Sequence, residues 1–164
     1  MPILGHGDIA SVLTDKEGYL FFVSGVSNSQ ETNEEAYRRE IELLSQQDTN
    51  LHIVYVSTLA VFYSDTRYTQ HKLFMEAFIK ERFARYTIIR IGNITWGTNP
   101  HTLINYLHAH PDAEIRDEYR YIVTQDEFLH WIDMIPEWSC ELNITGKRMK
   151  VKEIYDQYVR LYQR

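Results

Sequence analysis

Residues 51–72 read LHIVYVSTLAVFYSDTRYTQHK, and this stretch decides the fold that the sequence predicts. Its first part, from His52 to Val56, is a run of β-branched and aromatic residues that fits a strand buried on both faces. Two hydroxyl residues, Ser57 and Thr58, follow the run. A helical pattern opens at Tyr68, so the stretch predicts a strand that leads through a short loop into a helix.

Tyr68 and Lys72 are four residues apart, which places them one turn apart on the same face of a helix. A tyrosine hydroxyl has a pKa of about 10 in water, too high for a general base at neutral pH. A nearby ammonium group favours the phenolate and lowers that pKa. Thr58 could hold the oxygen on which charge changes during a reaction. Because the chain has 12 tyrosines, a chance Tyr/Lys pair on an exposed helix face is the alternative.

The surrounding motifs strengthen the functional interpretation. The segment TLAVFY (58–63) precedes the Tyr-x-x-x-Lys motif, and Glu76 and the segment YTIIRIGNI (86–94) follow it. This order resembles that of the extended short-chain dehydrogenase/reductases, which include nucleotide-sugar epimerases, dehydratases and reductases. Their pattern runs strand, Ser-Ser/Thr, Ala-Val-Tyr, Tyr-x-x-x-Lys, helix, and a strand ending Arg-x-x-Asn-Val. The resemblance covers about residues 19–162.

The resemblance implies roles for individual residues. Tyr68 would be the catalytic acid/base, Lys72 would lower its pKa and hold the nicotinamide ribose, and Thr58 would bind the reacting oxygen. Asn93 would touch the substrate phosphate or the loop that binds it. Arg120, with Arg116 as the second choice, would reach the diphosphate of a nucleotide-linked sugar. A turn asparagine and an arginine paired with surface acids are the alternatives for Asn93 and for the arginines. NAD or NADP would be the cofactor.

A glycine-containing turn, Gly5-His6-Gly7-Asp8-Ile9-Ala10, follows the short apolar run at residues 1–4. Gly5, Gly7 and Ala10 would bind the cofactor if this turn led into a helix whose N-terminus faces a pyrophosphate. Asp8 is awkward there, because a carboxylate repels phosphate. The alternative is a simple turn followed by a helix that Asp8 caps.

The next predicted strand, Tyr19–Val23, resembles the fourth strand of the family and leads into Ser24 and Gly25, which we also assign to cofactor binding. The second and third strands, with the acidic residue that binds the adenosine ribose, are then missing. We therefore expect weak binding of NAD or NADP. The helices at 34–46 and 72–85 match the pair that packs across the family's dimer interface, which implies a homodimer.

Later elements are expected from local patterns. A helix follows Pro100 over residues 101–110, and its histidine spacings are poor for chelation, so no metal site is predicted. Asp126 is expected to cap a helix over residues 127–134. A closing helix is expected over residues 149–162, where apolar residues recur at helical spacing.

The composition describes an ordinary globular protein. The chain has 164 residues, 44% hydrophobic, with a formal net charge of −6 and a mean hydropathy of −0.40, which fits one domain over residues 1–164. No apolar run approaches the length of a membrane span, and no secretory signal is visible. The acidic balance gives no reason to expect nucleic acid as a partner. The single cysteine, Cys140, fits a reducing cytoplasm.

The predicted fold class is α/β, a reduced Rossmann-like parallel sheet with helices on both faces. Its strands are expected at residues 1–4, 19–23, 52–56, 87–91 and 140–144. Two functions follow from different classes. The first is an NAD(P)-dependent epimerase, dehydratase or reductase that acts on a nucleotide sugar. The second is a catalytically degenerate relative that serves as a binding or assembly protein.

Overall fold

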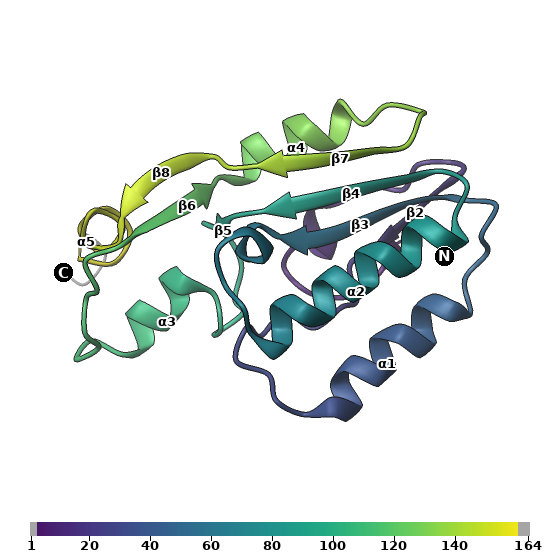
Figure 1. Cartoon of the computed structure of the whole chain (residues 1–164). Helices are drawn as coiled ribbons and strands as arrows, with labels where there is room; N and C mark the ends of the chain where they lie inside the picture. The colour runs from purple at the N-terminus through teal and green to yellow at the C-terminus, as the bar shows by residue number, and fades with distance from the viewer. Residues whose placement is uncertain (1–2, 161–164) are drawn as a thin grey trace.

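A parallel sheet of five strands forms the centre of the molecule, with strand order β1-β2-β3-β4-β7 (Figure 1). The computed structural model describes residues 3–160. The strands of this sheet are β1 (Ile3–Leu4), β2 (Tyr19–Phe22), β3 (His52–Thr58), β4 (Tyr86–Ile91) and β7 (Cys140–Ile144). The predicted α/β fold class and the parallel sheet are confirmed, and the ends of β2, β3, β4 and β7 lie within two residues of the expected ones. Residues 1 and 2 of the first expected strand lie outside the described residues.

Two long helices cover one face of the sheet, side by side (Figure 1). They are α1 (Glu34–Ser45) and α2 (Arg67–Arg82). Leu44 of α1 and Met75 and Ile79 of α2 pack with Leu20 and Ile53 of the sheet in one buried cluster. Because alternate residues of a strand point to opposite faces, this cluster uses every second residue of β2 and β3.

The opposite face is covered by α4 (Gln125–Asp133) and by a short 3₁₀ turn at Ala10–Val12. Phe128 of α4 packs with Phe21, Val54 and Ile89, and Val12 of the turn joins this cluster. Helices therefore lie on both faces of the sheet, as predicted, and they bury it on both sides.

A smaller sheet extends the molecule beyond the carboxyl ends of the main strands (Figure 1). It contains β5 (Asn93–Ile94), β6 (Tyr119–Val123) and β8 (Lys147–Lys150), in the order β5-β6-β8. The helices α3 (Leu103–Ala109) and α5 (Val151–Ile154) pack against it, and a π-helical turn (Tyr155–Val159) continues α5.

The prediction of a helix after the glycine turn is wrong. Only the 3₁₀ turn forms there, and no side chain caps it. β1 and β2 are parallel neighbours, so residues 5–18 must run back from the carboxyl end of β1 to the amino end of β2. This is close to the minimum length of such a crossover, which leaves little chain for a helix. Asp8, the expected cap, is bound elsewhere.

Three other helices have different bounds from those expected. Thr66 caps α2, since its hydroxyl accepts from the Thr69 amide at 3.1 Å. The helix therefore begins at Arg67, one residue before the expected start at Tyr68, and it ends at Arg82 and not at residue 85. Thr124, and not Asp126, caps α4, because its hydroxyl accepts from the Glu127 amide at 3.2 Å. The helix expected over residues 101–110 is the shorter α3.

The closing helix expected over residues 149–162 is also wrong at its start. Met149 lies in β8, which pairs antiparallel with β6 as far as Lys150, so the helix can begin only at Val151. The part of this prediction that falls on residues 161 and 162 lies outside the described residues. Among residues 3–160, no helix is both long and apolar enough to cross a membrane.

Candidate functional site

A cavity of about 560 Å³ opens where the first four strands of the main sheet end. Ligands of open α/β sheets bind at this edge, and the volume lies within the usual range of small-molecule pockets. The cavity brings together eight of the ten predicted site residues, which come from six separate segments: Gly7, Ser24, Gly25, Thr58, Tyr68, Lys72, Asn93 and Arg120.

Gly5 and Ala10 do not line this cavity. Gly5 makes a tight turn with φ of +137°, and a side chain there would collide with the Val23 carbonyl. Ala10 opens the 3₁₀ turn. Gly7 does line the cavity, and no atom lies within 4 Å of the position that its Cβ would take. Of the three predicted cofactor-binding residues in the glycine turn, only Gly7 therefore borders the cavity.

Thr58 lies at the end of β3, where its hydroxyl oxygen accepts from the Ala60 amide at 3.1 Å. This contact caps a 3₁₀ turn over Leu59–Phe62 and fixes the position of the oxygen. A hydroxyl both donates and accepts, so the Thr58 hydrogen remains able to point at a ligand oxygen.

Lys72 is almost fully buried, with 4% of its surface exposed. Its ammonium nitrogen donates to the Tyr55 hydroxyl at 3.2 Å and lies 5.6 Å from the centroid of the Tyr68 ring. Tyr68 itself is partly exposed, in the first turn of α2. The predicted Tyr68–Lys72 pair therefore shares a site, but the only hydrogen bond that the described structure gives to the ammonium goes to a different tyrosine.

A buried carboxylate lies behind this lysine. Glu40 of α1, with 3% of its surface exposed, accepts a hydrogen bond from the Tyr55 hydroxyl at 2.6 Å. Its other oxygen accepts from the Val26 amide at 2.7 Å and lies 3.2 Å from Nε2 of His71. Glu40 thus connects the loop after β2, which lines the cavity, to Lys72 through Tyr55.

This environment keeps Glu40 ionised. Burial by itself raises the pKa of a carboxyl group, because the charged form loses water. The positive charge of Lys72 and hydrogen bonds from His71 and Tyr55 outweigh that effect and hold the pKa of Glu40 at about 2. The same carboxylate and burial raise the pKa of Tyr55 well above its usual value. The Tyr55 hydroxyl therefore stays protonated and donates to Glu40.

A second buried network fixes the strand ends beside the cavity. Ser57 donates to Glu76 of α2 at 2.7 Å, and Nε of Arg90 donates to the same carboxylate at 3.1 Å. Arg90 also donates to Asn143 and Glu141 of β7. These contacts join β3, β4, β7 and α2, so the Ser57 hydroxyl serves the scaffold and not a ligand.

The two predicted substrate residues are partly engaged within the chain. Asn93 lies in β5, not in a turn, and its amide nitrogen donates to the Tyr121 carbonyl at 3.2 Å. Arg120 lies in β6, donates to Glu118 at 2.6 Å, and lines the cavity. This ion pair is the contact expected if Arg120 is a surface arginine paired with an acid. Arg120 nevertheless lines the cavity.

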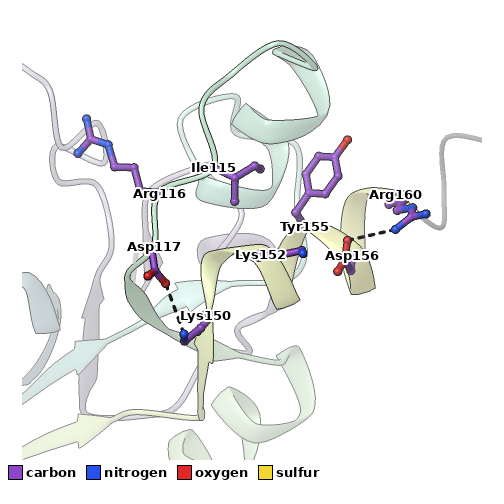
Figure 2. Close-up of a pocket in the computed structure, with 8 residues that line it drawn as sticks. All are labelled: Ile115, Arg116, Asp117, Lys150, Lys152, Tyr155, Asp156 and Arg160. Atoms are coloured by element: carbon purple, nitrogen blue, oxygen red, sulfur yellow. Dashed lines mark ion pairs between the residues drawn. The ribbon is translucent and has the colours of Figure 1, made fainter.

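A second cavity of about 620 Å³ lies beside α5 (Figure 2), and none of the ten predicted site residues lines it. It is lined by Ile115, Arg116, Asp117, Lys150, Lys152, Tyr155, Asp156 and Arg160. Two of its four basic side chains pair with its two carboxylates, Lys150 with Asp117 at 3.4 Å and Arg160 with Asp156 at 3.7 Å. The cavity at the strand ends is therefore the better candidate.

The sequence-based prediction missed Glu40 and Tyr55. A signal for Glu40 exists, because Tyr37, Glu40 and Leu44 recur at helical spacing and all three are buried. A charged residue on the buried face of a predicted helix requires a partner. Nothing in the local sequence indicates that the partners are Tyr55 and Lys72.

Three of the solved structures with the same architecture are enzymes. The match to WbmG from Bordetella bronchiseptica, solved with NAD, has a TM-score of 0.58 and 16% identity and covers 69% of this chain and 44% of that chain. The dTDP-4-dehydrorhamnose reductase of Bacillus anthracis, solved with NADP, matches at 0.54 and 17%, covering 75% and 55%. A UDP-galactose 4-epimerase matches at 0.56 and 14%, covering 83% and 59%.

The chain has the fold of these epimerase- and reductase-type enzymes. It spans about half the length of the solved proteins that it matches. No protein-family model matches the sequence, and no curated protein matches it either. The likeness therefore establishes the fold, and an activity has to be argued from the site.

The site fits one half of a dinucleotide better than the other. Thr58, Tyr68 and Lys72 line the cavity where a nicotinamide ribose would lie in the proposed arrangement. At the other end, β1 pairs only with β2, and no strand within residues 3–160 lies on its outer side. An adenosine site of the usual kind needs a strand there that carries an acidic residue. The described residues therefore lack the strand that carries the usual adenosine contacts, while the three residues assigned to the nicotinamide end line the cavity.

Proposed function

We propose that the cavity at the strand ends binds NAD or NADP together with a nucleotide-linked sugar, and that Tyr68 is the acid/base of an epimerase, dehydratase or reductase reaction. One observation carries this proposal. Thr58, Tyr68 and Lys72 line a single cavity with the loops after β1 and β2. A random Tyr-x-x-x-Lys pair on an exposed helix face would not produce this convergence.

Each residue has a defined part in the proposed reaction. A bound nicotinamide supplies or accepts a hydride. The Tyr68 hydroxyl exchanges a proton with the substrate oxygen, and the Thr58 hydroxyl donates a hydrogen bond to that oxygen. The Lys72 ammonium has three hydrogens, and Tyr55 accepts one of them, so it can also donate to a ribose hydroxyl.

Replacing Tyr68 with Phe tests the catalytic role. We expect turnover of a nucleotide-sugar substrate to fall about a hundredfold or more, because one general acid/base group is lost. The thermal midpoint of unfolding should change little, since only one partly exposed hydroxyl is removed. Tyr63→Phe is the matched control, because Tyr63 lines the same cavity from the neighbouring turn. Undiminished turnover in Tyr68→Phe would end the catalytic proposal.

A second candidate function is a binding or assembly protein that retains the fold without turnover. The absence of a strand beyond β1 in the described residues favours it, because a cofactor lacks its usual adenosine contacts there. The hydrogen bond from Lys72 to Tyr55 also favours it, because the ammonium is shared with a residue that does not take part in proton transfer.

Titration with NADH and NADPH distinguishes the two candidates. Losing one charged hydrogen bond to the adenosine ribose costs about 1.5–3 kcal/mol of binding free energy. We therefore expect both cofactors to bind with dissociation constants of about 1 mM. Discrimination should be slight, because the described residues lack the strand whose carboxylate would repel the 2′-phosphate. Calorimetry measures both constants. Micromolar binding of NADH with rejection of NADPH would contradict this expectation, and no binding of either would favour the second candidate.

We also propose that two copies of the chain pair through α1 and α2. Leu73 and Phe74 of α2 are about half exposed, at 48% and 50%, and Phe74 stacks on Phe78 with ring centroids 5.8 Å apart. An exposed apolar group of this kind on a helix is typical of a surface that a partner covers.

A further inference from the structure

Asp8, in the middle of the glycine turn, is bound to a loop some 90 residues away. One carboxylate oxygen accepts from the Thr98 amide at 2.9 Å, and the other accepts from the Asn99 amide at 2.8 Å. The Asp8 carbonyl accepts from the indole nitrogen of Trp96 at 3.0 Å. The turn after β1 and the loop after β5 are therefore held together by this one residue.

The two amides that hold Asp8 have the form of an anion site. They belong to successive residues that follow Gly97, whose φ is +99°, and successive backbone N–H groups in such turns form concavities that bind anions. The loop is shaped closely around the carboxylate, since a Cβ on Gly97 would lie 2.0 Å from Cγ of Asp8. Asp8 and Asn99 both line the cavity at the strand ends, so this anion site borders the candidate functional site.

We infer that Asp8 is an internal latch that occupies this anion site and thereby opposes the binding of a diphosphate-bearing ligand at the glycine turn. A phosphate group approaching Gly7 meets a negative charge, and it can reach the amides of Thr98 and Asn99 only by displacing that charge. Displacement breaks two charge-assisted hydrogen bonds, which are stronger than neutral ones. The inference deepens the proposed function and rests on it only for the nature of the natural ligand.

Substitution of Asp8 tests the latch with inorganic pyrophosphate as the probe. Asp8→Ala frees both amides and removes the charge, so we expect its affinity for pyrophosphate to be about tenfold higher than that of the unaltered protein in calorimetry. Asp8→Asn removes the charge with little change of shape and should also bind more tightly. Asp15→Asn is the control, because it changes the net charge by the same amount at an exposed residue. Asp15 lies shortly before the amino end of β2, whereas the cavity lies at the carboxyl ends of the strands.

Amide hydrogen exchange gives a second measurement that needs no ligand. The Thr98 and Asn99 amides should exchange at least tenfold faster in Asp8→Ala than in the unaltered protein, and Asp15→Asn should leave them unchanged. Unchanged pyrophosphate affinity in both Asp8 variants would overturn the inference, as would unchanged exchange in Asp8→Ala. A gain in pyrophosphate affinity without any binding of NADH would support the latch and reject the cofactor proposal, so the two failures are distinguishable.

Discussion

Lowering the pH from about 4.5 to about 2 is expected to cost the protein about 3 kcal/mol of unfolding free energy at Glu40 alone. In the folded protein the pKa of Glu40 is about 2, below its ordinary value of 4.5, because Lys72, His71 and Tyr55 together outweigh the effect of burial. A carboxyl group whose pKa is lowered by folding stabilises the protein fully at pH values above the pKa that the group has in the unfolded chain. That stabilisation is lost as the pH falls toward the folded pKa.

The glutamine variant isolates this contribution. Glu40→Gln cannot titrate, so its unfolding free energy should fall less steeply between pH 4.5 and 2 than that of the unaltered protein. Glu42→Gln, at an exposed position of the same helix, is the matched control and should follow the unaltered protein. Urea unfolding at a series of pH values measures all three. Parallel curves for Glu40→Gln and the unaltered protein would show that Glu40 is not the group responsible.

Replacing Arg90 with Met is expected to destabilise the protein by about 3–5 kcal/mol, because it leaves Glu76 buried without its cation. Only 4% of the Glu76 side chain and 11% of the Arg90 side chain are exposed. The cost should appear as a lower urea midpoint. Arg38→Met is the matched control, since Arg38 pairs with Glu35 on the surface and such pairs contribute about 1 kcal/mol or less.

A double variant separates the loss of the pair from the loss of packing. Replacing Glu76 with Leu together with Arg90→Met removes both buried charges, so it should be more stable than Arg90→Met alone. A double variant as unstable as the single one, or a single variant that unfolds at the same urea concentration as Arg38→Met, would show that the pair does not hold α2 against β4.

The main sheet could be predicted because its signals are local. The apolar runs that begin β2, β3 and β4 are continuous, as expected for strands buried on both faces, and each strand lies within two residues of its expected bounds. β8 was missed because Lys147–Lys150 carries three basic residues and only Met149 is buried. Its strand conformation comes from pairing with β6, which no local pattern announces.

The candidate site could be predicted only in part. Parallel strands end at a common edge, so residues that follow such strands are expected to lie together, and Ser24, Thr58 and Asn93 do so. The partners of each side chain could not be predicted in the same way. Lys72 was paired with Tyr68, but its ammonium donates to Tyr55. Arg120 was assigned either to a ligand or to a surface acid, and it pairs with Glu118 while it also lines the cavity.

The sequence by itself determined the order of the strands along the chain and the helical spacing of Tyr68 and Lys72, since both depend on short-range periodicity. Only the tertiary structure decided what these residues face. It turned Lys72 toward Tyr55 and the carboxylate of Glu40, and it placed Asp8 on the amides of Thr98 and Asn99. The physical reason is that a buried charge binds whichever complementary group the packing brings within reach, and these groups come from distant segments of the chain.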